Sequence, residues 1–170
     1  MKFNTKFNTK LLVRLALLAA ISLILGKFLS FKLEPWGRVS LENLTVIMSG
    51  YLYGPLAGMI CGIVAHITGC IAYGYAINPI ITVGAAVVGG YAGVFGINGI
   101  CKRAHLSLSV VAAHLCGSVL IKSLGIYLYY ATPIETLVLR IPIYAVTGVI
   151  EFVILGIMLK HKGLRELMEN

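Results

Sequence analysis

Long apolar runs constrain this chain most, because they leave a lipid bilayer as the environment in which it can fold. A membrane helix needs about 20 mainly apolar residues to cross the hydrocarbon core. Runs of that kind lie near residues 10–30, 55–72, 79–97, 107–130 and 137–159. Only 12% of the 170 residues are charged, whereas soluble domains have about 25%. The sequence therefore predicts an all-α membrane protein, with residues 1–170 as a single integral membrane domain.

A shorter apolar segment, residues 41–53, lies between the first two runs. As a helix it would be about 20 Å long, which is short for a crossing. We count it as a span nevertheless, because the charge pattern favours an even number of crossings. The prediction is thus six transmembrane helices.

The positions of the basic residues predict the orientation through the positive-inside rule. With the N- and C-termini cytoplasmic, nine of the 14 basic residues lie inside, namely Lys2, Lys6, Lys10, Arg14, Lys102, Arg103, Lys160, Lys162 and Arg165. The formal charge of +8 then follows from topology, and no nucleic-acid partner is needed to explain it. We expect a multi-pass protein of the cell membrane that is surrounded by the lipid bilayer.

Glycines recur at every fourth residue through the second and third spans, at Gly50, Gly54, Gly58 and Gly62. Small residues at this spacing let membrane helices approach closely. Pro55 directly follows Gly54, and proline favours the first position of a helix. The pattern predicts a tight turn at Gly54 with a short packing face on each side of it.

Two cations lie within the apolar runs, in the half that the predicted orientation places outside. Lys122 belongs to the fifth span and Arg140 to the start of the sixth. Charged side chains are expensive inside a membrane and usually mark functional sites. We expect both to face an outward-opening cavity that binds an anion. The alternative is that each side chain snorkels to the outer headgroups.

Aromatic and hydrogen-bonding residues gather at the same predicted depth. The candidate binding residues, besides the two cations, are Trp36, Arg38, His66, Tyr75, Asn78 and Tyr144. Cations combined with flat rings suit a small anionic ligand that itself contains rings. Plainer roles stay open: aromatic residues belt membrane interfaces, Asn78 precedes a proline at a helix start, and His66 could be an ordinary buried histidine.

The inner half of the sixth span contains one acidic residue, Glu151, which we expect to form a structural pair with Arg14 at comparable depth. The four cysteines show no metal-binding spacing and are expected to act as small apolar side chains. No catalytic residues or metal site are predicted, because the chain has no aspartate and only six glutamates. An enzyme acting on lipid phosphates, which needs clustered carboxylates for metal, is therefore disfavoured.

Three segments resemble a known family. They are R-L-A-L-L-A-A (14–20), the Gly-Pro junction in M-S-G-Y-L-Y-G-P-L-A-G-M-I-C-G-I-V-A-H-I-T-G-C (48–70), and G-Y-A-I-N-P-I-I-T-V-G-A (74–85). Together with six short spans they are similar to the S component of an energy-coupling factor (ECF) vitamin transporter of the folate type. His66 departs from the family, since many S components have an acidic residue at this position.

The resemblance implies a function for the chain and a set of partners. The chain would capture folate with high affinity and contain no cofactor or enzyme activity, while ATP would be used by two partner ATPase subunits. Ala16 and Ala20 match the A-x-x-x-A pattern that contacts the transmembrane coupling subunit in that family. The alternatives are an S component for another vitamin, such as pantothenate, riboflavin or biotin, and a stand-alone secondary transporter.

Overall fold

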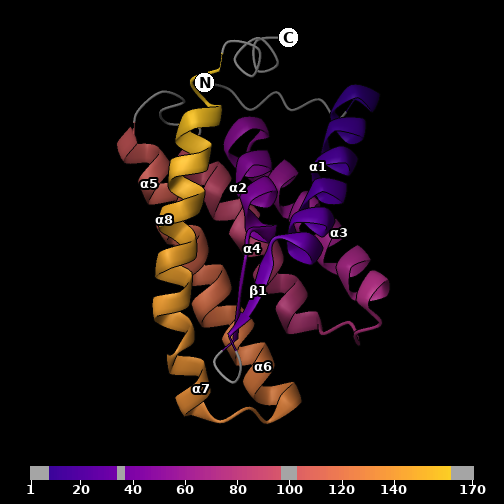
Figure 1. The fold of residues 1–170 in the computed structure, drawn as a ribbon. Coiled ribbons are helices and arrows are strands. Elements are labelled where there is room, and N and C mark those ends of the chain that lie inside the picture. The colour runs from indigo at the N-terminus through magenta and orange to yellow at the C-terminus, as the bar shows by residue number, and fades with distance from the viewer. Residues whose placement is uncertain (1–7, 34–36, 97–102, 162–170) are drawn as a thin grey trace.

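The computed structural model describes residues 8–33, 37–96 and 103–161, and these parts form a helical bundle with one small hairpin (Figure 1). The elements in chain order are α1 (Thr9–Phe28), β1 (Ser30–Leu33), β2 (Gly37–Ser40), α2 (Glu42–Tyr53), α3 (Pro55–Tyr73), α4 (Pro79–Gly96), α5 (Arg103–Ala112), η1 (Ala113–Ile121), α6 (Lys122–Tyr130), α7 (Ile134–Val138) and α8 (Arg140–Met158).

The prediction of an all-α membrane protein is confirmed. Five helical segments in the described parts are long and apolar enough to cross a membrane: Thr9–Phe28, Pro55–Tyr73, Pro79–Gly96, Ala104–Tyr130 and Ile134–Met158. They agree closely with the five long spans predicted from the sequence. The fourth segment is one continuous rod made of α5, η1 and α6, and the last combines α7 with α8.

Helix α2 is the short sixth segment, with 12 residues, and it lies inside the bundle. Every residue from Asn43 to Tyr51 is buried, as expected of a helix at the core of a bundle. The start of α1 and the end of α8 lie at the same end of the bundle (Figure 1), as an even number of crossings requires. The count of six spans and the cytoplasmic location of the termini remain predictions.

The glycine pattern produces the close contacts that the sequence predicted. α2 ends at Tyr53, and α3 begins at Pro55 after Gly54, whose φ of 95° favours glycine. On either side of this turn, a Cβ atom added at Gly50 or Gly58 would collide with the carbonyl oxygen of Gly89 in α4. These three helices therefore pack with their backbones in contact.

Two local features were not predicted from the sequence. The connection between α1 and α2 contains an antiparallel hairpin in which Ser30 pairs with Ser40, and it runs along the bundle toward the end where α6 and α7 lie (Figure 1). The fifth span contains a π-helix, η1, between its two α-helical parts. π-Helical segments are rare and occur often at functional sites.

Candidate binding site

A cavity of about 530 Å³ opens among the helices in the half of the bundle nearest α7. This volume falls in the range of about 300–1,000 Å³ that is typical of small-molecule sites. Its lining comes from α1, α2, α3, α4, α6, α7 and α8, and includes Ser22, Glu42, Asn43, His66, Cys70, Tyr73, Tyr75, Lys122, Thr132, Thr136, Arg140, Ile143 and Tyr144. The predicted orientation places this half on the outer side.

Both predicted cations line this cavity. Lys122 begins α6 and is only 6% exposed, and its Nζ donates to Asn43 Oδ1 of α2 at 3.2 Å. Arg140 begins α8; its Nη2 donates to the Tyr144 hydroxyl at 2.8 Å, and its Cζ lies 5.3 Å from the centre of the Tyr144 ring. Neither cation forms an ion pair with a carboxylate in the described part of the chain. The described lining thus has two cationic side chains and one acidic one, that of Glu42, and this excess of positive charge favours an anionic ligand.

Aromatic rings border the same space. Tyr73 and Tyr75 stack with centroids 5.9 Å apart, and the Tyr73 hydroxyl donates to the Leu23 carbonyl at 3.2 Å. Tyr75 is 60% exposed, so its ring is accessible at the edge of the cavity. Trp36 lies outside the described residues, and only the backbone of Arg38, in β2, is described.

His66 lines the cavity from α3 and already has two side-chain neighbours. Its Nδ1 lies 3.0 Å from the Thr82 hydroxyl of α4, and its Nε2 lies 3.6 Å from the Cys70 thiol one turn further along α3. The contact with Thr82 fixes the ring across the α3–α4 interface. His66 therefore combines a structural contact with a place on the cavity wall.

Asn78 is the one predicted site residue with a described side chain that does not line the cavity. It is 2% exposed, and its Oδ1 accepts from the backbone N–H groups of Ile80 at 2.9 Å and Ile81 at 3.3 Å. Its Nδ2 donates to the Gly125 carbonyl of α6 at 3.1 Å. The structure gives this amide the helix-capping role, with an added bond that ties α4 to α6.

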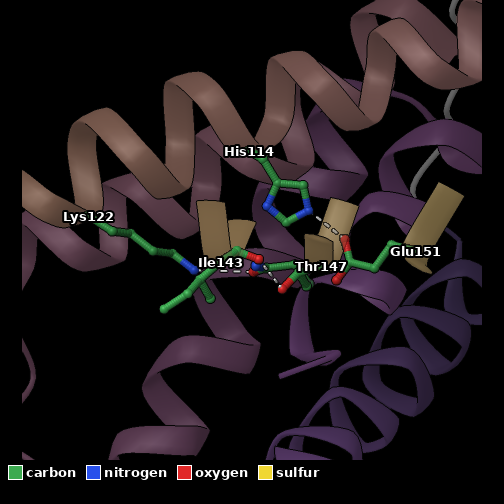
Figure 2. A network of polar contacts seen from close by, with 6 residues as sticks. His114, Lys122, Ile143, Thr147 and Glu151 are labelled. Atoms are coloured by element: carbon green, nitrogen blue, oxygen red, sulfur yellow. Dashed lines mark hydrogen bonds and ion pairs between the residues drawn. The ribbon is translucent and has the colours of Figure 1, made fainter. Parts of the chain in front are cut away.

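The expected pairing of Glu151 with Arg14 is wrong. Glu151 is fully buried, and its Oε2 lies 2.6 Å from Nε2 of His114 in η1 (Figure 2). α1, which contains Arg14, lies on the opposite side of the bundle from α8 (Figure 1). Similar depth in the membrane therefore did not bring the two charges together, because depth says nothing about which helices are neighbours.

Sequence reasoning missed several polar lining residues, namely Ser22, Cys70, Thr132 and Thr136. Isolated hydroxyls and thiols in apolar helices carry no distinctive pattern, since they can bond to the helix's own carbonyls. Within the described residues no group of three or more His, Cys, Asp or Glu side chains could hold a metal ion.

The comparison with known families decides what kind of protein this is. Residues 10–161 match the family described as ECF transporter, substrate-specific component. The chain belongs to this family. It is thus an integral membrane S component, the subunit of an ECF transporter that determines the substrate and works with the other transporter components. This family is a transporter family, not an enzyme family.

Two solved structures share the fold of this S component. One is FolT bound with folic acid, with a TM-score of 0.70 and 19% identity over 89% of this chain and 91% of that chain. The other is an S component of a bacterial ECF transporter, with a TM-score of 0.66 and 16% identity over 95% of this chain and 98% of that one. No curated protein sequence matches the chain.

Proposed function

We propose that this S component captures folate from outside the cell in the cavity between α1–α4 and α6–α8. The observation that carries the proposal is the meeting of two cations, Lys122 and Arg140, with tyrosine rings in one cavity of about 530 Å³. Folate combines an anionic glutamate tail with the flat pterin and benzoyl rings. The two cations suit the acidic tail, and the tyrosine rings suit the flat pterin and benzoyl rings.

The cations are the groups that would hold the glutamate tail. Arginine can bind a carboxylate through two parallel hydrogen bonds, whereas lysine acts as a point charge. Because Lys122 is almost fully buried, its attraction for a carboxylate is weakly screened by water. Tyr75 offers an exposed ring for stacking, and Tyr144 adds an aromatic ring beside Arg140.

Glu42 is the one acidic residue among the described lining residues. Its carboxylate oxygens can accept hydrogen bonds from the ring N–H and amino groups of a pterin. Asn43, beside it on α2, already accepts from Lys122. The start of α2 thus offers acceptors for the ring end of folate, while the start of α8 offers Arg140 for the acidic end.

Uptake would require the partners that such transporters use. We propose that the transmembrane coupling subunit docks on α1 at Ala16 and Ala20, both of which are exposed in the structure. Small side chains allow close helix packing in membranes. ATP would be used by two partner ATPase subunits, so the energy for uptake would come from outside this chain.

Ligand binding by the detergent-purified chain tests the proposal. Calorimetry and quenching of Trp36 fluorescence, the chain's one tryptophan, would be measured with folate, pantothenate, riboflavin, thiamine and biotin. We expect tight binding of folate alone. Tight binding of another vitamin, or of none, would refute the substrate assignment.

A matched pair of charge-removing variants tests the site itself. Arg140→Ala removes a cavity cation, whereas Lys27→Ala removes an exposed cation at the end of α1 that does not line the cavity. Charged hydrogen bonds contribute about 1.5–3 kcal/mol, so Arg140→Ala should weaken folate binding about 10- to 100-fold. Lys27→Ala should leave it unchanged; equal losses in both variants would refute the site.

A further inference from the structure

Helix α8 brings Arg140, Ile143 and Tyr144 to the cavity, yet few of its residues are buried in the bundle. Its buried residues are Thr147, Glu151 and Leu155, spaced four apart on one face. Other large side chains of this helix, such as Val149 and Ile157, are more than 60% exposed. In a membrane these exposed side chains contact lipid tails, which fix neither the rotation nor the height of a helix.

The imidazole of His114 lies against this buried face. Its Nε2 is 2.6 Å from Glu151 Oε2, and its ring centre is 5.5 Å from that of Tyr144, at an angle of 34°. Between them, a Cβ atom added at Gly148 would lie 3.4 Å from His114 Cδ2. His114 is therefore bounded by three residues of α8 on successive turns, Tyr144, Gly148 and Glu151.

A continuous set of contacts connects this pair to the cavity. Glu151 contacts His114, the His114 ring packs on Tyr144, and the Tyr144 hydroxyl accepts from Arg140 at 2.8 Å. Tyr144 and Arg140 line the cavity, but His114 and Glu151 do not. Figure 2 shows the carboxylate of Glu151 and the imidazole directed toward each other, with Lys122 further along the same continuous helical rod as His114.

The buried pair gives α8 one favourable position. A slip by one residue would move every side chain of α8 about 1.5 Å along the axis and rotate it by about 100°. Glu151 would then lose its partner while still buried or facing lipid, which is strongly unfavourable for a carboxyl group. The same slip would withdraw Arg140 and Tyr144 from their places in the cavity wall.

We propose that His114 and Glu151 are positioning residues, which set the register of α8 against η1 and thereby place Arg140 and Tyr144 for ligand binding. The inference rests on the proposed function in two respects: Arg140 and Tyr144 are taken as ligand-binding residues, and folate is the ligand used in the first assay. It assigns a role in binding to two residues that do not line the cavity.

A double-mutant cycle measured on folate affinity tests the coupling. Glu151→Leu should weaken binding about tenfold, whereas Glu151→Gln, which can still accept from His114, should stay within about threefold of the unmodified chain. When Arg140→Ala is already present, adding Glu151→Leu should weaken folate binding by a further factor of less than about two, because the arginine that Glu151 positions is gone. Equal costs in both backgrounds, or no cost in either, would overturn the proposal.

Two further variants separate positioning from general destabilisation. Thr147→Val lies on the same buried face, and the hydroxyl that it removes bonds only to the Ile143 carbonyl of its own helix, at 2.8 Å; folate affinity should be unchanged. His114→Gln keeps a donor for Glu151 but removes the ring beneath Tyr144, and should weaken binding. If Glu151→Leu does not fold, His114→Gln is used in its place. Unchanged folate affinity of the His114→Gln variant would count against the proposal.

A measurement without ligand tests the register directly, so that it stands even if the chain does not bind folate. Spin labels would be attached at Val149→Cys on α8 and Val83→Cys on α4, both more than half exposed, after replacing the native cysteines. Glu151→Leu should shift or broaden the distance distribution by about 1.5–5 Å, from one residue to nearly one turn. Thr147→Val should leave it unchanged. An unaltered distribution in Glu151→Leu would refute the positioning role whatever ligand the cavity binds.

Discussion

Replacing Gly58 by alanine should separate the helices at the centre of the bundle. An added methyl group would overlap the Gly89 carbonyl oxygen and lie 2.6 Å from both the Gly89 carbonyl carbon and the Gly50 Cα. Ordinary contact begins at 3.4 Å, so α3 would have to withdraw by about 1 Å to clear the oxygen, which is the nearest atom. A gap of about 0.5–1 Å forfeits a quarter to a half of the attraction of each atom pair.

The magnitude follows from two opposing terms. Overpacking against backbone atoms, which cannot rotate away, costs about 3 kcal/mol. Alanine is a better helix former than glycine by about 1 kcal/mol, so the net loss for Gly58→Ala is about 2 kcal/mol. Gly69→Ala on the same helix is the matched control, because its methyl group would meet only Leu23 Cδ2, at 3.5 Å. That control should gain up to about 1 kcal/mol.

The assay is the fraction of monodisperse protein that size-exclusion chromatography recovers after heating in one detergent. A difference of about 3 kcal/mol between the two variants corresponds to about 6–12 °C in the midpoint for a chain of this length. Gly58→Ala should have the lower midpoint. Equal midpoints, or a higher one for Gly58→Ala, would contradict the backbone contact between α3 and α4.

Three further predictions concern single residues. Asn78→Ala should lower the thermal midpoint by about 4–8 °C, because it removes a helix cap and the bond to Gly125, which together contribute about 2 kcal/mol. Folate affinity measured by calorimetry should stay within about threefold of the unmodified chain. A tenfold loss of affinity would instead assign Asn78 to the ligand. Lys122→Met should weaken folate binding about 10- to 100-fold in calorimetry. It should also raise the thermal midpoint of the ligand-free protein, because a buried cation without a carboxylate partner is unfavourable. A lower midpoint without ligand would show that Lys122 stabilises the fold. Ala16→Leu should reduce folate uptake by vesicles that contain the assembled transporter while calorimetry on the isolated chain finds unchanged binding; lost binding would place Ala16 outside the partner interface.

The long helices and the central turn could be predicted from the sequence because their causes are local. Apolar runs of sufficient length report the spans directly, and a glycine followed by proline reports the end of one helix and the start of the next. The cavity cations were also predictable, since a lysine and an arginine within apolar runs stand out against their neighbours. Each of these signals lies within one continuous segment of the chain.

The contacts between distant helices could not be predicted in the same way. Glu151 was assigned to Arg14 on depth alone, whereas its partner His114 is 37 positions away in the sequence and belongs to a span with other polar residues. The hairpin of β1 and β2 and the π-helical turns of η1 likewise depend on packing, because short strands and extra helix residues have no strong sequence pattern. The Asn78 amide was ambiguous because capping and ligand binding use the same group.

The packing of the bundle explains why the cavity lies where it does. Half of the α4 span is buried, against 17% of the last span, which contains α8. Glycines bring α2, α3 and α4 into backbone contact, which leaves no room for a ligand between them. The described glycines of α8 make no such backbone contact, and the buried hydrogen bond that joins this helix to η1 is that of Glu151 with His114. The ligand space therefore opens between this closely packed trio of helices and α8, which the contact of Glu151 with His114 joins to η1. Under the proposed positioning role, the affinity of the cavity depends on Glu151, which lies about three turns from Arg140 along α8.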